Sequence, residues 1–149
     1  MKLTLFALLL AASCAKSPEP GAETTTSAGS VSQASGLVGP RWRLVELEGE
    51  PSIGGGGARE PHLIFSTDSA DRVGGATGCN SMGGTYEADA TTIRFSKLFS
   101  TKMACVEEDR MRQEARFVKA LESADRYAIS GDTLALSAGS EIVAKFVKS

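Results

Sequence analysis

Short runs in which apolar and polar residues alternate make up most of the chain beyond residue 40. In 41–47, for example, the alternation places Trp42 and Leu44 on one face, as in a half-buried strand. The other runs are bounded by glycine, aspartate or Ala-Asp, which favour turns. They span 62–66, 72–77, 84–87, 91–95, 126–130, 133–136 and 141–147. The pattern predicts short antiparallel strands, with a tight hairpin at Gly131-Asp132.

One segment, 107–124, has a helical period instead. Its apolar residues recur mainly at spacings of three and four, as on one side of a helix. They are Met111, Ala115, Phe117, Val118, Ala120 and Leu121. Three acidic residues at 107–109 open the segment, where negative charge stabilises a helix N-terminus. We therefore predict an α+β fold, a curved antiparallel sheet or partial barrel with one amphipathic helix packed on it, and Met111 and Phe117 in the core.

The first 13 residues have the pattern of a secretory signal. Lys2 precedes an apolar run at 3–12 that, at about ten residues, is too short to span a bilayer. Small residues then lead into Cys14, which resembles the bacterial lipobox, where the cysteine becomes the lipidated first residue of the mature protein. Ala15, in place of aspartate, is typical of lipoproteins sorted to the outer membrane. We expect Cys14 to be lipidated; the alternative is a secreted protein cleaved nearby, with Cys14 unmodified.

Residues 14–39 have the composition of a flexible tether. They are mostly Ser, Thr, Gly, Pro, Ala and Glu, and so bury too little apolar surface to offset the entropy of ordering. The remainder, 40–149, has the length of one small domain. We therefore expect a signal peptide at 1–13, a tether at 14–39 and one folded domain at 40–149, held at the outer membrane by its lipid with the domain in the periplasm.

Charge and glycine patterns exclude two classes of function. The chain has 16 basic and 18 acidic residues, well interspersed, and no basic patch with interleaved aromatic residues, so nucleic-acid binding is not expected. The glycine run at 54–57 lacks the Lys-Ser/Thr that completes a phosphate-binding loop. We expect a monomer without a cofactor.

Of the three cysteines, we expect Cys14 to carry the lipid and the other two, Cys79 and Cys105, to pair with each other. If the chain is exported, Cys79 and Cys105 meet an oxidising compartment in which disulfides persist. Closing a loop of about 27 residues stabilises a fold by roughly 3.5 kcal/mol. That is a large share of the 5–15 kcal/mol, roughly, that a domain of this size has in total. We therefore predict a Cys79–Cys105 disulfide.

Other roles for these cysteines need partners that the sequence does not supply. A structural zinc site needs four ligands and a catalytic one three plus water, whereas only Cys79, Cys105 and His62 present themselves, without Cys-x-x-Cys spacing. We predict no metal site.

A hydrolase or redox enzyme that uses Cys79, Cys105 or His62, with Asn80 or an aspartate as orienter, is the alternative function, and it requires free thiols.

The order of several short strings resembles the META domain family, typified by the heat-inducible HslJ-type bacterial lipoproteins. The strings are Trp42-x-Leu44, Gly78-Cys79-Asn80 and Ser100-Thr101-Lys102-Met103-Ala104-Cys105, and the match covers nearly all of 41–149. The resemblance implies a compact α+β domain and an association with the cell envelope, with heat or antibiotic stress, or with motility or secretion. It implies no catalytic mechanism, and a shared fold is a weak guide to function.

The motif residues Trp42, Gly78, Asn80, Ser100, Thr101 and Met103 have two interpretations: they are architectural, or the two cysteine strings together form an exposed recognition loop. The function we expect is that of a non-enzymatic, lipid-anchored envelope protein that binds another protein or an apolar ligand, linked to envelope or heat stress. A structural component of an envelope complex is a second alternative, beside the cysteine-dependent enzyme.

Loss of the lipidation residue tests the anchor. We expect the Cys14→Ser chain to incorporate no fatty acid in metabolic labelling. When 1–13 is also exchanged for a signal that is cleaved without a cysteine, the protein should leave the membrane fraction. Its thermal unfolding should be unchanged, because the expected tether separates this end from the folded domain. Lipid incorporation, or sedimentation of the exchanged chain with membranes, would contradict the assignment.

Overall fold

The computed structural model describes residues 36–149 except 55–58, 69–70 and 104. The expected signal at 1–13, Cys14 and most of the expected tether at 14–39 lie outside the described residues. Within the described ranges, no helix is long and apolar enough to cross a bilayer.

Nine strands and one helix make up the described part of the chain. They are β1 (Arg41–Leu47), β2 (Glu50–Pro51), β3 (His62–Ser66), β4 (Arg72–Ala76), β5 (Ser81–Ala88), β6 (Ile93–Ser100), α1 (Glu108–Ser123), β7 (Arg126–Ser130), β8 (Thr133–Ala138) and β9 (Glu141–Lys148). All pairs are antiparallel, in the order β6-β5-β4-β3-β1-β9-β8-β7, with β2 on β1. The first strand and the last are therefore direct neighbours inside the sheet.

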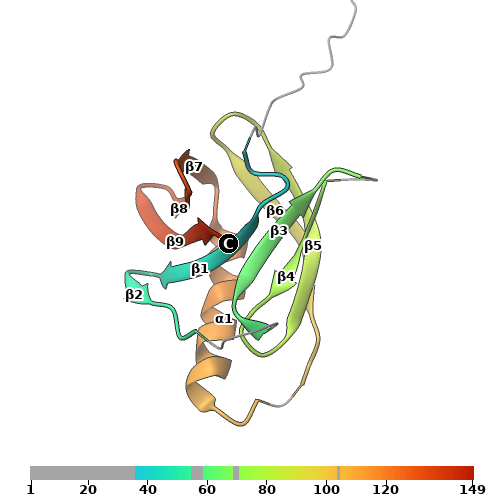
Figure 1. Ribbon diagram of the computed structural model, residues 1–149, viewed down its shortest axis with the longest axis vertical. Coiled ribbons are helices and arrows are strands. Elements are labelled where there is room, and N and C mark those ends of the chain that lie inside the picture. The colour runs from blue at the N-terminus through green and yellow to red at the C-terminus, as the bar shows by residue number, and fades with distance from the viewer. Residues whose placement is uncertain (1–35, 55–58, 69–70, 104) are drawn as a thin grey trace, which may run out of the picture. The chain divides into compact units, whose positions relative to one another are not determined.

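The sheet curls until its two edge strands meet at one end. The N–H of Ile93 donates to the carbonyl of Asp125 (3.1 Å), and the N–H of Tyr127 donates to the carbonyl of Thr91 (2.9 Å). Elsewhere β6 and β7 stay apart, and α1, which contacts β1, β6, β8 and β9, lies between the arms of the sheet (Figure 1). The predicted fold, one helix on a curved antiparallel sheet or partial barrel, is confirmed as a half-barrel.

The core fills the space between the concave side of the sheet and α1. Trp42 and Leu44 are both buried, as the alternation along β1 predicts. The Trp42 indole N–H donates to the carbonyl of Leu37 (2.9 Å), so that its one polar atom is satisfied. Phe117 of α1 is fully buried against Phe146 of β9, with ring centroids 5.9 Å apart.

The prediction that Met111 is a core residue is wrong. Its side chain is 45 % exposed, and Ala115 on the same side of α1 is also exposed. Because each helical residue turns by about 100°, Met111, Ala115 and Val118 lie on the side opposite to the buried stripe. The apolar residues of this helix therefore form two stripes, of which only the one that contains Phe117 enters the core.

A glutamine takes the core-facing position one turn before Phe117. Gln113 is buried, and its amide exchanges two hydrogen bonds with the backbone of Ile53: Oε1 accepts from the N–H (2.6 Å) and Nε2 donates to the carbonyl (3.2 Å). These bonds offset the cost of burying the amide. They also fasten the segment after β2 to α1.

Strands β5 and β6 are longer than predicted because a bulge interrupts their alternation. The pairing register shifts between Gly83 and Thr85, and Lys97 on β6 has a left-handed backbone (φ 52°). Beyond the bulge the Phe99 ring covers Gly83, where an added Cβ would lie 2.6 Å from the ring. An extra residue in one strand reverses which side chains face the core and which face the solvent. The alternation of apolar and polar residues therefore does not predict the part of the strand beyond the bulge.

Two adjacent glycines on β4 offer a matched test of close packing in the sheet. An added Cβ at Gly75 would overlap the carbonyl oxygen of His62 and lie 2.9 Å from its carbonyl carbon, whereas at Gly74 the nearest atom, the Met82 carbonyl oxygen, is 3.9 Å away. We expect Gly75→Ala to destabilise the fold by about 1–3 kcal/mol and Gly74→Ala to have a much smaller effect, measured by urea unfolding. Equal losses in the two variants would contradict this packing.

Candidate functional site

The Gly-Cys-Asn string forms the turn between β4 and β5. The N–H of Thr77 donates to the carbonyl of Asn80 (2.9 Å), which leaves Gly78 and Cys79 at the tip. Gly78 has φ +111°, a conformation that residues with a side chain rarely adopt. The glycine thus permits a tight turn that places a thiol and an amide next to each other.

The Ser-Thr-x-Met-x-Cys string leaves the end of β6 and runs past this turn. Ser100 is the last residue of β6 and pairs with Met82. The N–H of Thr101 then donates to the carbonyl of Ser81 (3.0 Å), and the Thr101 hydroxyl accepts from the Ser81 N–H (3.2 Å). These bonds extend the strand pairing by one residue and bring the rest of the string beside the turn.

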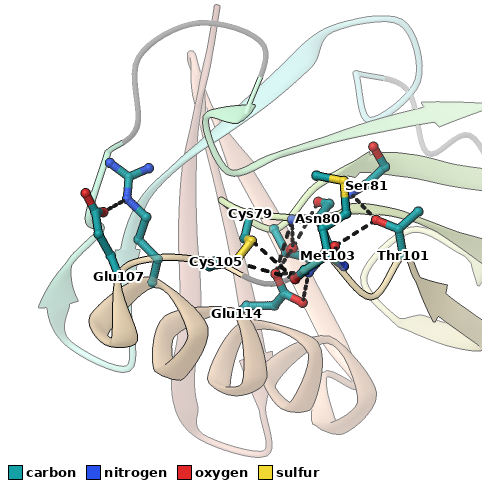
Figure 2. The surroundings of a disulfide bond; sticks show 10 residues. Cys79, Asn80, Ser81, Thr101, Met103, Cys105, Glu107 and Glu114 are labelled. Atoms are coloured by element: carbon teal, nitrogen blue, oxygen red, sulfur yellow. Dashed lines mark hydrogen bonds and ion pairs between the residues drawn. A yellow bond between two sulfur atoms is a disulfide. The ribbon is translucent and has the colours of Figure 1, made fainter.

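Cys79 and Cys105 form a disulfide that joins the two strings, with Cα atoms 6.0 Å apart. This separation is ordinary for a disulfide. Figure 2 shows both sulfur atoms beside Asn80 and Glu114. Cys79 is buried and Cys105 half-buried. The pairing predicted from the cysteine count is thus present.

The amide of Asn80 holds three segments together (Figure 2). Its Oδ1 accepts from the Thr101 hydroxyl (2.8 Å) and from the N–H of Met103 (2.7 Å), and its Nδ2 donates to Glu114 Oε1 of α1 (2.9 Å). The side chain is 5 % exposed. Both ends of the amide are therefore used, and the turn, the segment after β6 and α1 share one side chain.

Glu114 is the residue of this site that sequence reasoning missed. Its Oε2 accepts from the hydroxyl of buried Thr77 (2.7 Å) and from the N–H of Asn80 (3.2 Å). These partners are 37 and 34 residues away along the chain. Nothing in the local sequence distinguishes Glu114 from the other glutamates of α1, so only the tertiary fold reveals its role.

Three potential metal-binding groups meet at this point. The sulfur atoms of Cys79 and Cys105 and a carboxylate oxygen of Glu114 all lie within 4.8 Å of one another.

His62, the third ligand considered from the sequence, lies on β3 and is absent from this cluster. Its Nδ1 is 2.7 Å from the carbonyl of Glu60, and burial lowers the pKa of its imidazole, against the opposing effect of that hydrogen bond. Trp42 is likewise apart, in the core.

A shallow groove of about 600 Å³ opens beside the disulfide, between the segment after β6 and the outer side of α1. Met103, Met111, Ala115 and Val118 form its apolar wall, together with Cys105. Met103 and Met111 are 46 % and 45 % exposed. The second apolar stripe of α1 therefore faces this groove, which we call the methionine groove.

Substitution of Asn80 by an isosteric acid tests the amide contacts. In Asn80→Asp a second carboxylate faces Glu114 and the donor is lost, so we expect a loss of about 2–3 kcal/mol at neutral pH. The loss should shrink in acid, because protonation of one of the two carboxyls removes the repulsion and restores a donor. Asn80→Ala, which lacks the second charge, should show a loss that depends less on pH. Parallel pH profiles of unfolding for the two variants would contradict this interpretation.

Comparisons with solved structures identify the same fold in other proteins. The NMR structure of a protein from Burkholderia xenovorans is 23% identical, with a TM-score of 0.60, and the match covers 76% of this chain and 83% of that one. A second NMR structure is 16% identical, with a TM-score of 0.59, over 74% of this chain and 91% of the other. The crystal structure of a DUF4847 family protein from Bacteroides vulgatus is 17% identical, with a TM-score of 0.52, over 74% and 93%.

At these identities the likeness extends to the fold alone. Comparison with curated proteins finds no match. The family model described as META domain matches residues 35–149, which include both cysteine strings, the turn that joins β4 to β5 and α1. The chain belongs to the META domain family.

Proposed function

We propose that this protein is a lipid-anchored component of the bacterial envelope that binds a partner protein or an apolar ligand, as part of a response to envelope or heat stress. The anchor rests on the sequence around Cys14: a short apolar run, small residues before the cysteine and a polar stretch after it. The stress association rests on the resemblance of the cysteine strings to those of HslJ-type lipoproteins.

The observation that carries the binding role is the methionine groove. Four apolar side chains line it, and two of them, Met103 and Met111, are nearly half exposed. Methionine is unbranched and polarizable, so it adapts to partners of different shape. Val106, which follows the disulfide in the chain, is fully exposed. Covering these exposed side chains with an apolar group lowers the free energy, and this favours binding.

Magnitudes indicate what kind of occupant the groove accepts. Covering the exposed parts of Met103 and Met111 yields about 1 kcal/mol each, too little for a stable complex, since a dissociation constant of 1 mM already corresponds to about 4 kcal/mol. The occupant must therefore make polar contacts as well. Lys102 and Lys119 also line the groove and can supply them.

The state of the cysteines favours binding over catalysis. An oxidised pair has no thiolate to act as a nucleophile, and Cys79 and Cys105 are joined. The polar atoms beside them are engaged with each other, because Asn80 and Glu114 are hydrogen-bonded. His62, the alternative base, lies on β3 and outside the cluster of Cys79, Cys105 and Glu114.

Polar substitution in the groove tests the binding role. We expect the double variant Met103→Ser, Met111→Ser to bind an environment-sensitive apolar fluorophore about tenfold more weakly than the parent chain, equivalent to about 1.4 kcal/mol. Ile142→Ser is the matched control, because Ile142 is also apolar and 45 % exposed but lies on β9 and does not line the groove. Fluorescence titration of the purified chain measures both.

Position 111 in the groove and the control position 142 can also be used to test for a protein partner. A photoreactive residue at 111 should crosslink to a partner in membranes from stressed cells, and the crosslink should fall when Met103 is also replaced by serine. A photoreactive residue at 142 should not form it. Equal dye affinities in the groove variant and the control, together with equal crosslinking from both positions, would contradict the proposal.

A further inference from the structure

We infer that reduction of the Cys79–Cys105 disulfide converts its surroundings into a binding site for a thiophilic divalent cation, with Zn²⁺ as the ion that fits best. The ligands are the two thiolates and the Glu114 carboxylate. This site adjoins the methionine groove, because Cys105 and Glu114 also line that groove.

The distances between the donor atoms suit one ion. The two sulfur atoms and a Glu114 oxygen lie within 4.8 Å of one another. Zinc binds sulfur at about 2.3 Å and carboxylate oxygen at about 2.0–2.2 Å, so tetrahedral ligands lie roughly 3.5–3.8 Å apart. Cys105 belongs to no helix or strand, and therefore its side chain can turn by the small amount that separates the sulfur atoms after reduction.

The Glu114 carboxylate is already oriented as a ligand would be. Its Oε2 is held by the Thr77 hydroxyl and the Asn80 N–H, whereas Oε1 accepts from Asn80 Nδ2, which also approaches Oε2 (3.1 Å). A carboxylate oxygen can accept two bonds, so Oε1 keeps a lone pair among the described contacts. Fixed outer partners of this kind commonly orient metal ligands.

Charge and access are compatible with an ion at this position. Two thiolates and one carboxylate carry three negative charges, of which Zn²⁺ neutralises two, and Lys102 and Lys119 line the adjoining groove. Cys105 is half-buried on the groove side, so the ion and a water molecule as fourth ligand can enter from there. Soft thiolates select zinc over magnesium or calcium, which prefer oxygen ligands alone.

The conversion balances with a dithiol of the thioredoxin class as reductant. Its two thiols supply two electrons and two protons: the S–S bond of Cys79 and Cys105 breaks, two thiols form, and the reductant leaves as its own disulfide. Zn²⁺ then displaces two protons to solvent as the thiolates bind it.

Cobalt titration tests the site directly. The full chain is reduced, freed of reductant without oxygen, and titrated with Co²⁺ as a spectroscopic substitute for Zn²⁺. We expect one Co²⁺ per chain with a thiolate-to-cobalt charge-transfer band, which Zn²⁺ abolishes, and no such band in the oxidised chain. Cys105→Ser should weaken the band. Glu114→Gln should lower the affinity for Co²⁺ by about tenfold or more.

Glu122→Gln is the matched control, because Glu122 is on the same helix and lines the same groove but is not part of the cluster. If Glu114→Gln does not fold, thermal unfolding of the parent chain decides: Zn²⁺ should raise the melting temperature of the reduced form and leave the oxidised form unchanged. Absence of the charge-transfer band in the reduced chain, or equal Co²⁺ affinity in the two glutamine variants, would overturn the inference.

Discussion

The buried amide of Asn80 is the contact on which the surroundings of the disulfide depend. An amide in the interior must satisfy a donor and an acceptor at once, and Asn80 does so with segments that are distant in the sequence: Thr101 and Met103 on one side and Glu114 on the other. This requirement fixes how the end of β6 passes the β4–β5 turn and how α1 sits beside both. The methionine groove exists because the amide holds its two walls at this spacing.

The disulfide and the amide act on different states of the chain. The covalent bond between Cys79 and Cys105 restricts the unfolded ensemble, whereas the hydrogen bonds of Asn80 specify one arrangement of the folded one. Each supports the other, because a fixed turn keeps the cysteines within bonding distance. This division also explains why the Gly-Cys-Asn string contains all three residue types: Gly78 allows the turn, Cys79 links it covalently and Asn80 orients it.

How much of this could be predicted from the sequence depends on the range of the interactions. Alternation along the strands and the helical period around Phe117 arise from neighbours in the chain, and they predicted the helix, the fold class and every strand except the two-residue β2. Assignment of Met111 to the core failed because α1 has two apolar stripes and periodicity alone does not say which one faces the sheet. The predicted strand stopped at residue 95, before the end of β6 at Ser100, because of the bulge at Lys97. Glu114 was missed because its partners are supplied by the turn after β4.

The pairing of β1 with β9 has a consequence for the order of events in the cell. Two arms of the sheet, β3–β6 on one side and β7–β9 on the other, are linked in the strand order through β1, whose partner on the second arm is β9. Ser149 still donates to the carbonyl of Arg41 (3.0 Å). A chain in which β9 has not yet been synthesised therefore lacks this pairing inside its sheet, and such long-range pairing is slow to form. The topology therefore delays completion of the sheet until β9 has been synthesised.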